Sequence, residues 1–295
     1  MKVALTGASG LLGSAFVDAL IAGGHAVHAI DRKSIAGQSP HTIAERLDGV
    51  DWLLHAAANT NVELCEVEVD ACYRDNLILS EQVADAARLA GVPLVYMSST
   101  GVYGCGAITP FAEYDDANPT THHHRAKLLG EAAVLARSGA NLVIRTGWLF
   151  GGEPENPKNF VARRIEEARR VRAEGGVMKS NQQQVGCPTF TRDVVSRVLA
   201  LVDSGHTGIF NCVNTGSASR FEYVSEIVRL SGESVVVKPA DAGIFNRRAK
   251  VSDNEAAVNW RMTQLGFEPM PRWEHSLATY IASLRGITHP EGGGV

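Results

Sequence analysis

The stretch that decides the fold is residues 1–31, MKVALTGASGLLGSAFVDALIAGGHAVHAID. It begins with an apolar strand, followed by a glycine-containing loop, an apolar, Ala-rich helix over 11–22 and a second apolar strand. Three glycines at the spacing G-x-x-G-x-x-G, Gly7, Gly10 and Gly13, run from the end of the first strand into the first turn of the helix. Glycine permits a tight turn and a close approach of the backbone to a ligand. This order predicts a strand–loop–helix–strand unit with a binding loop at its first turn.

The chemistry of this unit suits a dinucleotide. The helix after the loop points its free N–H groups and the positive end of its dipole at a bound pyrophosphate. Asp31 closes the second strand, where a carboxylate can accept both hydroxyls of an adenosine ribose. Arg32 and Lys33 could instead hold a 2′-phosphate, so the sequence leaves both NAD and NADP open as cofactors. The residues expected to bind the cofactor here are Thr6, Gly7, Gly10, Leu11, Leu12, Gly13, Asp31 and Arg32.

Composition narrows the class of protein. The chain has 295 residues, of which 45% are hydrophobic and 20% charged, as is usual for a soluble globular protein. A net charge of −4 without a dense Lys/Arg block argues against a nucleic-acid partner. The five cysteines are odd in number and form no C-x-x-C pair, which favours reduced thiols in a cytoplasmic protein over disulfides or a zinc site. The absence of a long apolar run argues against a membrane span.

Strands and helices alternate up to about residue 150, including expected helices over 72–90 and 121–138. This alternation predicts an α/β fold, a Rossmann-type, doubly wound parallel sheet, followed by a smaller C-terminal substrate lobe. We expect the dinucleotide-binding domain over 1–150, with 189–215 returning to it, and the lobe over 151–188 and 216–295. Small residues at the end of the buried strand near residue 55 leave room for a cofactor, namely Ala56, Ala57 and Ala58.

Further motifs follow in order along the chain: HAAA at 55–58, SSTGVYG at 98–104, Gly130-Glu131 and RTGWLFG at 145–151. Together with the glycine loop, this set resembles the extended short-chain dehydrogenase/reductase superfamily, and within it most closely the dTDP-4-dehydrorhamnose reductases. The resemblance implies a catalytic hydroxyl at a strand end and a Tyr-x-x-x-Lys motif on the next helix. By position the hydroxyl is Ser99, with Thr100 beside it, and the lysine is Lys127, which would also hold the nicotinamide ribose.

The position of the family's tyrosine is occupied by His123. Imidazole titrates near neutral pH, so His123 could act as the acid/base, one helical turn from Lys127. The alternatives are a water-relayed or Ser99/Thr100-led reaction, and loss of this chemistry. Tyr103 and Tyr114 are also close in sequence. Three consecutive histidines, at 122–124, point about 100° apart on a helix and cannot converge on one ion, so no metal site is expected.

The resemblance implies an NAD(P)-dependent oxidoreductase that reduces the keto group of a nucleotide-linked deoxysugar or a similar polar metabolite. The alternatives are an NAD-retaining sugar-nucleotide epimerase or dehydratase, and a catalytically degenerate, dinucleotide-binding regulatory subunit. Arg220, Arg247 and Arg248 could clamp a diphosphate in the second lobe, or could be ordinary surface arginines. The expected partner is a small-molecule substrate, and the resemblance leaves room for a homodimer.

Overall fold

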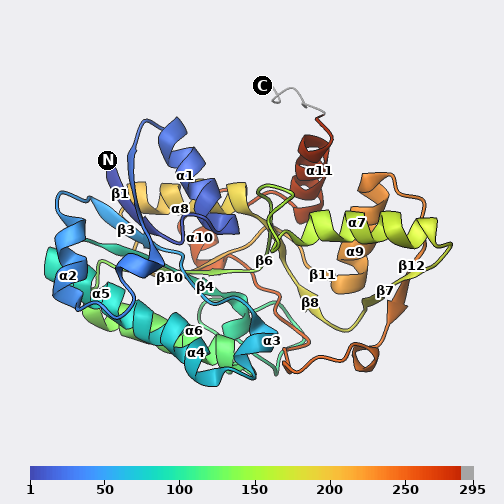
Figure 1. Ribbon diagram of the computed structural model, residues 1–295, viewed down its shortest axis with the longest axis horizontal. Coiled ribbons are helices and arrows are strands. Elements are labelled where there is room, and N and C mark those ends of the chain that lie inside the picture. The colour runs from blue at the N-terminus through green and yellow to red at the C-terminus, as the bar shows by residue number, and fades with distance from the viewer. Residues whose placement is uncertain (287–295) are drawn as a thin grey trace.

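The computed structural model describes residues 1–286, and the end of the expected second lobe, 287–295, lies outside the described residues. A six-stranded sheet forms one half of the molecule, with the strand order β10-β5-β4-β3-β1-β2 and every neighbouring pair parallel (Figure 1). Its strands are β1 (Lys2–Thr6), β2 (Ala26–Ile30), β3 (Trp52–His55), β4 (Leu94–Ser99), β5 (Leu142–Thr146) and β10 (Gly208–Cys212).

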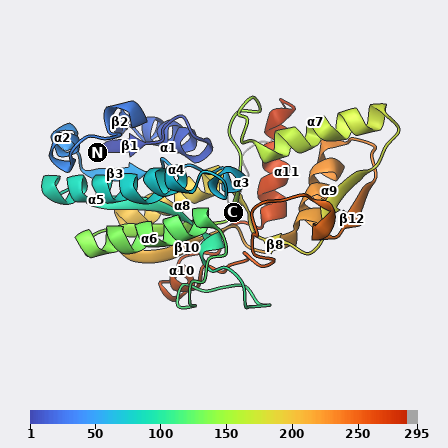
Figure 2. The same cartoon turned by 60° about the horizontal axis from the view of Figure 1, so that its bottom comes forward.

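Helices cover both faces of this sheet (Figures 1 and 2). One face packs against α1 (Leu11–Ala22) and α8 (Thr191–Asp203) in an apolar core that includes Phe16 and Phe210. The other face packs against α2 (Pro40–Ala44), α5 (Leu79–Ala90) and α6 (His122–Arg137). Apolar strands buried on both faces are typical of parallel sheets. The prediction of a Rossmann-type, doubly wound fold is confirmed.

The connection between β3 and α5 is less regular than the sequence predicts. Instead of one helix over 72–90, the chain forms α3 (Val62–Cys65), α4 (Val69–Tyr73) and a π-helical segment, η3 (Arg74–Ile78), before α5 begins. A π-helical turn inserts a residue into the helix and frees backbone groups, and such turns are frequent at functional sites. This segment packs against α6, the helix that carries His123 and Lys127.

The second half of the molecule lies beside the carboxyl ends of the strands (Figures 1 and 2). Its aromatic core joins α7 (Phe160–Ala173), α9 (Arg220–Ser231) and α11 (Trp273–Leu284). Short strands pair in three two-stranded sheets: β6 (Trp148–Phe150) with β9 (Pro188–Phe190), β7 (Met178–Asn181) with β12 (Val237–Ala240), and β8 (Val185–Gly186) with β11 (Ala218–Ser219). The remaining short helices are α10 (Trp260–Gln264), η1 (Arg32–Ser34), η2 (Glu45–Leu47), η4 (Thr100–Val102) and η5 (Ala242–Ile244).

The chain crosses between the two halves more than once. Strand β10 and helix α8, both from 189–215, belong to the central sheet and its covering layer. Met262 and Met270, from the stretch that the sequence places in the second lobe, also pack into the core beneath the sheet. No helix among the residues the structure describes has the length and apolar character needed to traverse a bilayer.

Candidate active site

The glycine loop between β1 and α1 is shaped by close backbone contacts. Gly7 has a φ of 76°, which side chains rarely adopt, and a Cβ at Gly13 would lie 2.0 Å from the Gly7 carbonyl oxygen. Only glycine therefore allows α1 to start this close to the loop. Within the described chain, no side chain caps the α1 N-terminus at Gly10, and its first turn contains no acidic residue. The free N–H groups and dipole of α1 fit a pyrophosphate.

Thr6 supports the neighbouring loop through a short chain of hydrogen bonds. Its hydroxyl is buried at the end of β1, lies 2.7 Å from His55 Nδ1 and accepts a hydrogen bond from the Ala57 amide at 3.3 Å. His55 Nε2 in turn lies 3.1 Å from the Ser80 hydroxyl. Burial, and then the charge of Lys127, lower the pKa of His55 to about 3, so the ring is neutral. Thr6 thus holds the Ala57 backbone, which packs closely against Gly7 of the glycine loop.

Asp31 and Arg32, the two residues expected at the adenosine ribose, lie at the end of β2. Asp31 is exposed and precedes the short helix η1. The Arg32 guanidinium forms an ion pair with Asp75, and its side chain remains 55% exposed. Arg74 approaches the same carboxylate at 3.6 Å. Arg32 can therefore still reach a ligand, but only in competition with an ion pair it already makes.

Lys127 projects from α6 onto the end of β4. Its Nζ donates a hydrogen bond to the Met97 carbonyl oxygen at 2.7 Å and lies 4.5 Å from the centre of the Tyr96 ring. Burial lowers the pKa of Lys127 to about 8, and the charge of Glu131 opposes this effect. Two residues beyond Met97, the Ser99 hydroxyl is half-buried and accepts a hydrogen bond from the Gly101 amide at 3.2 Å. Thr100 follows and is buried.

A buried ionic network lies behind this strand end, and the sequence analysis assigned it no role. Glu131 on α6 and Arg145 on β5 form an ion pair of 2.7 Å, and Ser98 donates to the same carboxylate. The Arg145 guanidinium lies 4.8 Å from the Tyr103 ring. Tyr103 donates its hydroxyl to Asn211 Oδ1 at 2.7 Å. The network holds α6, and with it Lys127, against β4 and β5.

Neither Tyr103 nor Tyr114 can replace the catalytic tyrosine that the resemblance implies. Tyr103 is fully buried and occupied by Asn211, and burial raises its pKa to about 12. Tyr114 is 68% exposed and contacts the edge of Trp260. The position four residues before Lys127, where the resemblance implies a tyrosine, is therefore occupied by His123 and not replaced by either of these two tyrosines.

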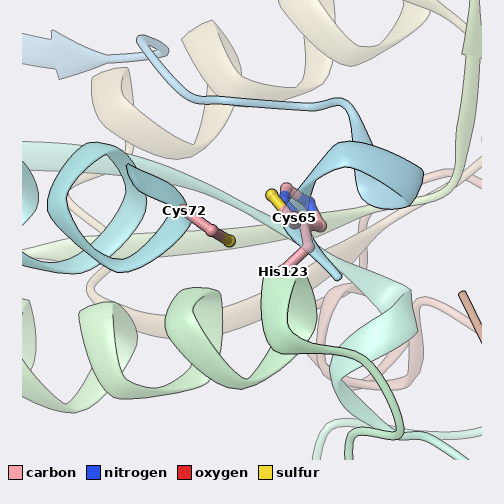
Figure 3. A group of neighbouring side chains, drawn as sticks. All are labelled: Cys65, Cys72 and His123. Atoms are coloured by element: carbon pink, nitrogen blue, oxygen red, sulfur yellow. The ribbon is translucent and has the colours of Figure 1, made fainter. Parts of the chain in front are cut away.

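His123 is buried in the first turn of α6. Its Nδ1 lies 3.5 Å from Asn76 Nδ2, and its ring turns toward Cys65 and Cys72 (Figure 3). Burial, followed by the neighbouring His124 and Lys127, lowers the pKa of His123 well below the usual value of histidine. The imidazole is consequently neutral at pH 7. The structure places His123 and Lys127 on one helix, beside the strand end that carries Ser99. The Ser99 hydroxyl accepts a hydrogen bond from the Gly101 amide, and the His123 ring lies against the Asn76 side chain.

Asn76 in the π-helical segment ties these parts together, and sequence reasoning missed it. Its side-chain oxygen accepts from the Asn59 amide at 3.0 Å, and its Nδ2 donates to the Asn59 carbonyl at 3.1 Å. Its own backbone carbonyl accepts from Ser80 at 2.8 Å and from the Tyr96 hydroxyl at 3.4 Å. The sequence shows only an asparagine within an expected helix. Such residues are common in helices, so the pattern does not identify Asn76 as part of a site.

The three arginines proposed for a diphosphate do not act as one group, because Arg220 makes different contacts from Arg247 and Arg248. Arg220, at the start of α9, has its guanidinium carbon over the Trp148 ring, 3.3 Å from the ring centre, and Trp148 Nε1 donates to Glu255 at 2.7 Å. Burial lowers the pKa of Arg220 to about 10, and the charge of Glu255 opposes this effect. Arg247 instead forms an ion pair with Glu63 at 2.7 Å, across to the sheet half, and Arg248 is exposed. Only Arg220 thus sits on an aromatic platform.

The chain resembles known proteins over nearly its whole length. It is 29% identical to a dTDP-4-dehydrorhamnose reductase of Mycolicibacterium smegmatis, over 97% of this chain and 87% of that protein. The crystal structure of a dTDP-4-dehydrorhamnose reductase from Clostridium acetobutylicum matches with a TM-score of 0.90, at 29% identity, over 97% of this chain and 100% of that one. A Bacillus anthracis dTDP-4-dehydrorhamnose reductase, solved in complex with NADP, matches with a TM-score of 0.87, at 26% identity, over 96% and 99% of the two chains.

These matches confirm the resemblance to sugar-nucleotide reductases of the extended short-chain dehydrogenase/reductase type. The family match covers residues 1–285, which includes the glycine loop, the strand end at Ser99 and the second half as far as residue 285. By this match the chain belongs to the RmlD substrate binding domain family.

Proposed function

We propose that the chain is an NAD(P)-dependent oxidoreductase that reduces the keto group of a nucleotide-linked deoxysugar. The observation that carries this proposal is the placement of Lys127: a buried ammonium, fixed to the Met97 carbonyl, at the strand end that carries Ser99. The open N-terminus of α1 lies at the same edge of the sheet, because parallel strands end together. Relatives named as dTDP-4-dehydrorhamnose reductases support the same substrate class for this chain.

The residues present fit a dinucleotide. The Gly7–Gly13 loop and the first turn of α1 would hold the pyrophosphate, and residues 56–58 would line its path. Asp31 and Arg32 would meet the adenosine ribose. When bound, the nicotinamide supplies the hydride. The NADP named with the B. anthracis relative favours NADPH, and the partly exposed Arg32 guanidinium is the side chain that would recognise its 2′-phosphate.

The chain's own residues would handle the substrate oxygen and its proton. Ser99 would orient the oxygen, with Thr100 behind it, and Lys127 would hold the nicotinamide ribose. His123 would take the tyrosine's place by passing a proton through a water, since imidazole is shorter than a phenol. A neutral imidazole can do this by accepting a proton at one nitrogen and donating from the other.

The second half would bind the nucleotide part of the substrate. Arg220 offers a guanidinium on an aromatic platform, and a guanidinium pairs with phosphate oxygens bidentately. We propose Arg220 as the diphosphate contact, in preference to Arg247, which already pairs with Glu63. This assignment makes 151–188 and most of 216–286 the substrate lobe and 1–150 with 189–215 the cofactor domain. A cytoplasmic homodimer would complete the proposal, and sedimentation of the purified protein would measure its oligomeric state.

The experiment is hydride turnover with NADH and NADPH separately, on a panel of dTDP-linked 4-keto-6-deoxy sugars. Wild type is compared with His123→Ala, with His122→Ala as the control from the same helical turn. The proposal expects cofactor consumption by wild type and by His122→Ala, and a large loss in His123→Ala.

Two outcomes would favour the other functions. Tight cofactor binding, measured by calorimetry, without turnover of any panel member would favour a regulatory dinucleotide-binding subunit. Cofactor that stays bound through purification, with sugar conversion but no net cofactor consumption, would favour an epimerase or dehydratase.

A further inference from the structure

Two thiols and an imidazole converge in a buried cluster beside α6. Cys65 ends α3, Cys72 lies in α4 and His123 lies in the first turn of α6 (Figure 3). One ligand atom from each residue lies within 4.8 Å of the other two. Both cysteines are completely buried, and His123 is 5% exposed. Three separate helices thus bring these side chains to one point.

The donor set is one that a zinc ion prefers. Thiolate sulfur and imidazole nitrogen bind Zn²⁺ tetrahedrally, with Zn–S bonds of about 2.3 Å, which places two sulfurs about 3.8 Å apart. The two sulfur atoms therefore need to approach each other by at most about 1 Å, which is within the reach of small side-chain rotations. Carboxylates take no part in the cluster, so oxygen-preferring cations such as Mg²⁺ and Ca²⁺ find no suitable ligands in it.

The surroundings also suit a metal–thiolate centre. Asn76 Nδ2 lies 3.5 Å from Cys72 Sγ and 3.5 Å from His123 Nδ1, so an amide donor faces the cluster. A donor at this distance from Cys72 Sγ would stabilise the thiolate form of that sulfur. Asn76 is itself held by its two hydrogen bonds to Asn59. Ala126 belongs to the same buried cluster as the two cysteines.

We propose that Cys65, Cys72 and His123 form a binding site for Zn²⁺. On binding, two S–H bonds break and two protons leave to solvent, while two Zn–S bonds and one Zn–N bond form. No electron is transferred. A water molecule would complete the tetrahedron. The site does not depend on the proposed reductase activity, but occupancy would take one nitrogen of His123 and so prevent its part in proton transfer.

The test uses the full-length protein, reduced and stripped of metal. Zinc affinity is measured by competition with a chromogenic chelator, and cobalt is added separately because Co²⁺ bound to thiolate shows a ligand-to-metal charge-transfer absorption. We expect one zinc per chain, two protons released per zinc and the thiolate–cobalt band. Cys72→Ala should weaken zinc binding by more than the roughly 100-fold that loss of an outer hydrogen bond costs.

The control is Cys105→Ser, which removes the exposed thiol and should leave zinc binding unchanged. Circular dichroism and thermal melting establish that each variant is folded. The proposal fails if wild type shows no thiolate–cobalt band, if Cys72→Ala binds zinc as tightly as wild type, or if Cys105→Ser abolishes binding. The wild-type cobalt spectrum decides the matter even where Cys72→Ala does not fold. None of these readouts needs turnover, so failure of the reductase proposal would leave them interpretable.

Discussion

The ammonium of Lys127 donates a hydrogen bond to the carbonyl oxygen of Met97, 2.7 Å away, and this bond fixes α6 to the end of β4. It also aims a buried positive charge at the residues that follow Met97, beginning with Ser98 and Ser99. A buried ammonium costs free energy unless it is paired and hydrogen-bonded, and the Met97 carbonyl is a neutral acceptor. We therefore expect Lys127 to matter far more for reaction than for folding.

The first prediction follows from this bond. Lys127→Met keeps the length of the side chain but removes the donor and the charge, so kcat/KM should fall by at least about 100-fold. The free energy of unfolding should change by no more than about 1–2 kcal/mol, because the loss of the hydrogen bond to Met97 and the removal of a desolvated ammonium act in opposite directions. Steady-state kinetics and urea unfolding measure the two effects. Lys179→Met, on an exposed position of β7, is the control, and an equal loss of activity there would contradict the assignment.

The second prediction concerns the contact between α1 and the glycine loop. A Cβ at Gly13 would lie 2.0 Å from the Gly7 carbonyl oxygen, a backbone atom that cannot move aside. Gly13→Ala should displace the loop, weaken NAD(P)H binding by 10-fold or more and cost about 1–3 kcal/mol of stability. Calorimetric titration of the cofactor and urea unfolding measure this.

The matched substitution is Gly139→Ala, where an added Cβ meets no atom within 4 Å. It should bind cofactor as wild type does. Unchanged cofactor affinity in Gly13→Ala would show that the loop is not the pyrophosphate site.

The third prediction concerns the buried pair of Glu131 and Arg145, whose side chains are 2% and 5% exposed. Removing one partner leaves the other charge buried without its counter-ion, which costs about 3–5 kcal/mol. Glu131→Leu and Arg145→Met should each destabilise the chain by that order, and the double variant by less than their sum. Urea unfolding of all four proteins gives the coupling energy, and simple additivity would mean that the pair is not coupled.

The sequence predicts the sheet half well because its signals are local. The glycine loop, the apolar strands and Asp31 follow one another within residues 1–31, and backbone geometry alone relates them. The pairing of Glu131 with Arg145, or of Tyr103 with Asn211, joins residues far apart in the chain, and nothing in their spacing shows it.

The cysteine–histidine cluster shows the same limit more sharply. The expectation of no metal site rested on the three consecutive histidines and on the absence of a C-x-x-C pair, both local patterns. Cys65, Cys72 and His123 come from three helices, and only the folded chain brings them together. The break of the expected 72–90 helix at Arg74–Ile78 is equally hidden, because a π-helical turn has no residue pattern of its own.

The last prediction is a loss of stability in acid that depends on His55. Its ring is fully buried, with both nitrogens in hydrogen bonds, and its pKa falls from 6.5 to about 3, chiefly because of burial. Between pH 6.5 and about pH 3, His55 is therefore protonated in the unfolded chain and neutral in the folded chain. The stabilisation is complete above about pH 6.5 and is lost progressively as the pH falls toward 3.

Between about pH 6.5 and pH 5 this one residue should cost about 2 kcal/mol of unfolding free energy, and burial of His123 and His124 acts in the same direction. His55→Asn should be less stable than wild type near neutral pH, because hydrogen bonds are lost, yet its stability should depend less steeply on pH. Urea unfolding at several pH values measures both slopes, with the exposed His41→Asn as control. Parallel slopes for wild type and His55→Asn would mean that His55 is not the proton acceptor, since a neutral amide at that position cannot take up the proton.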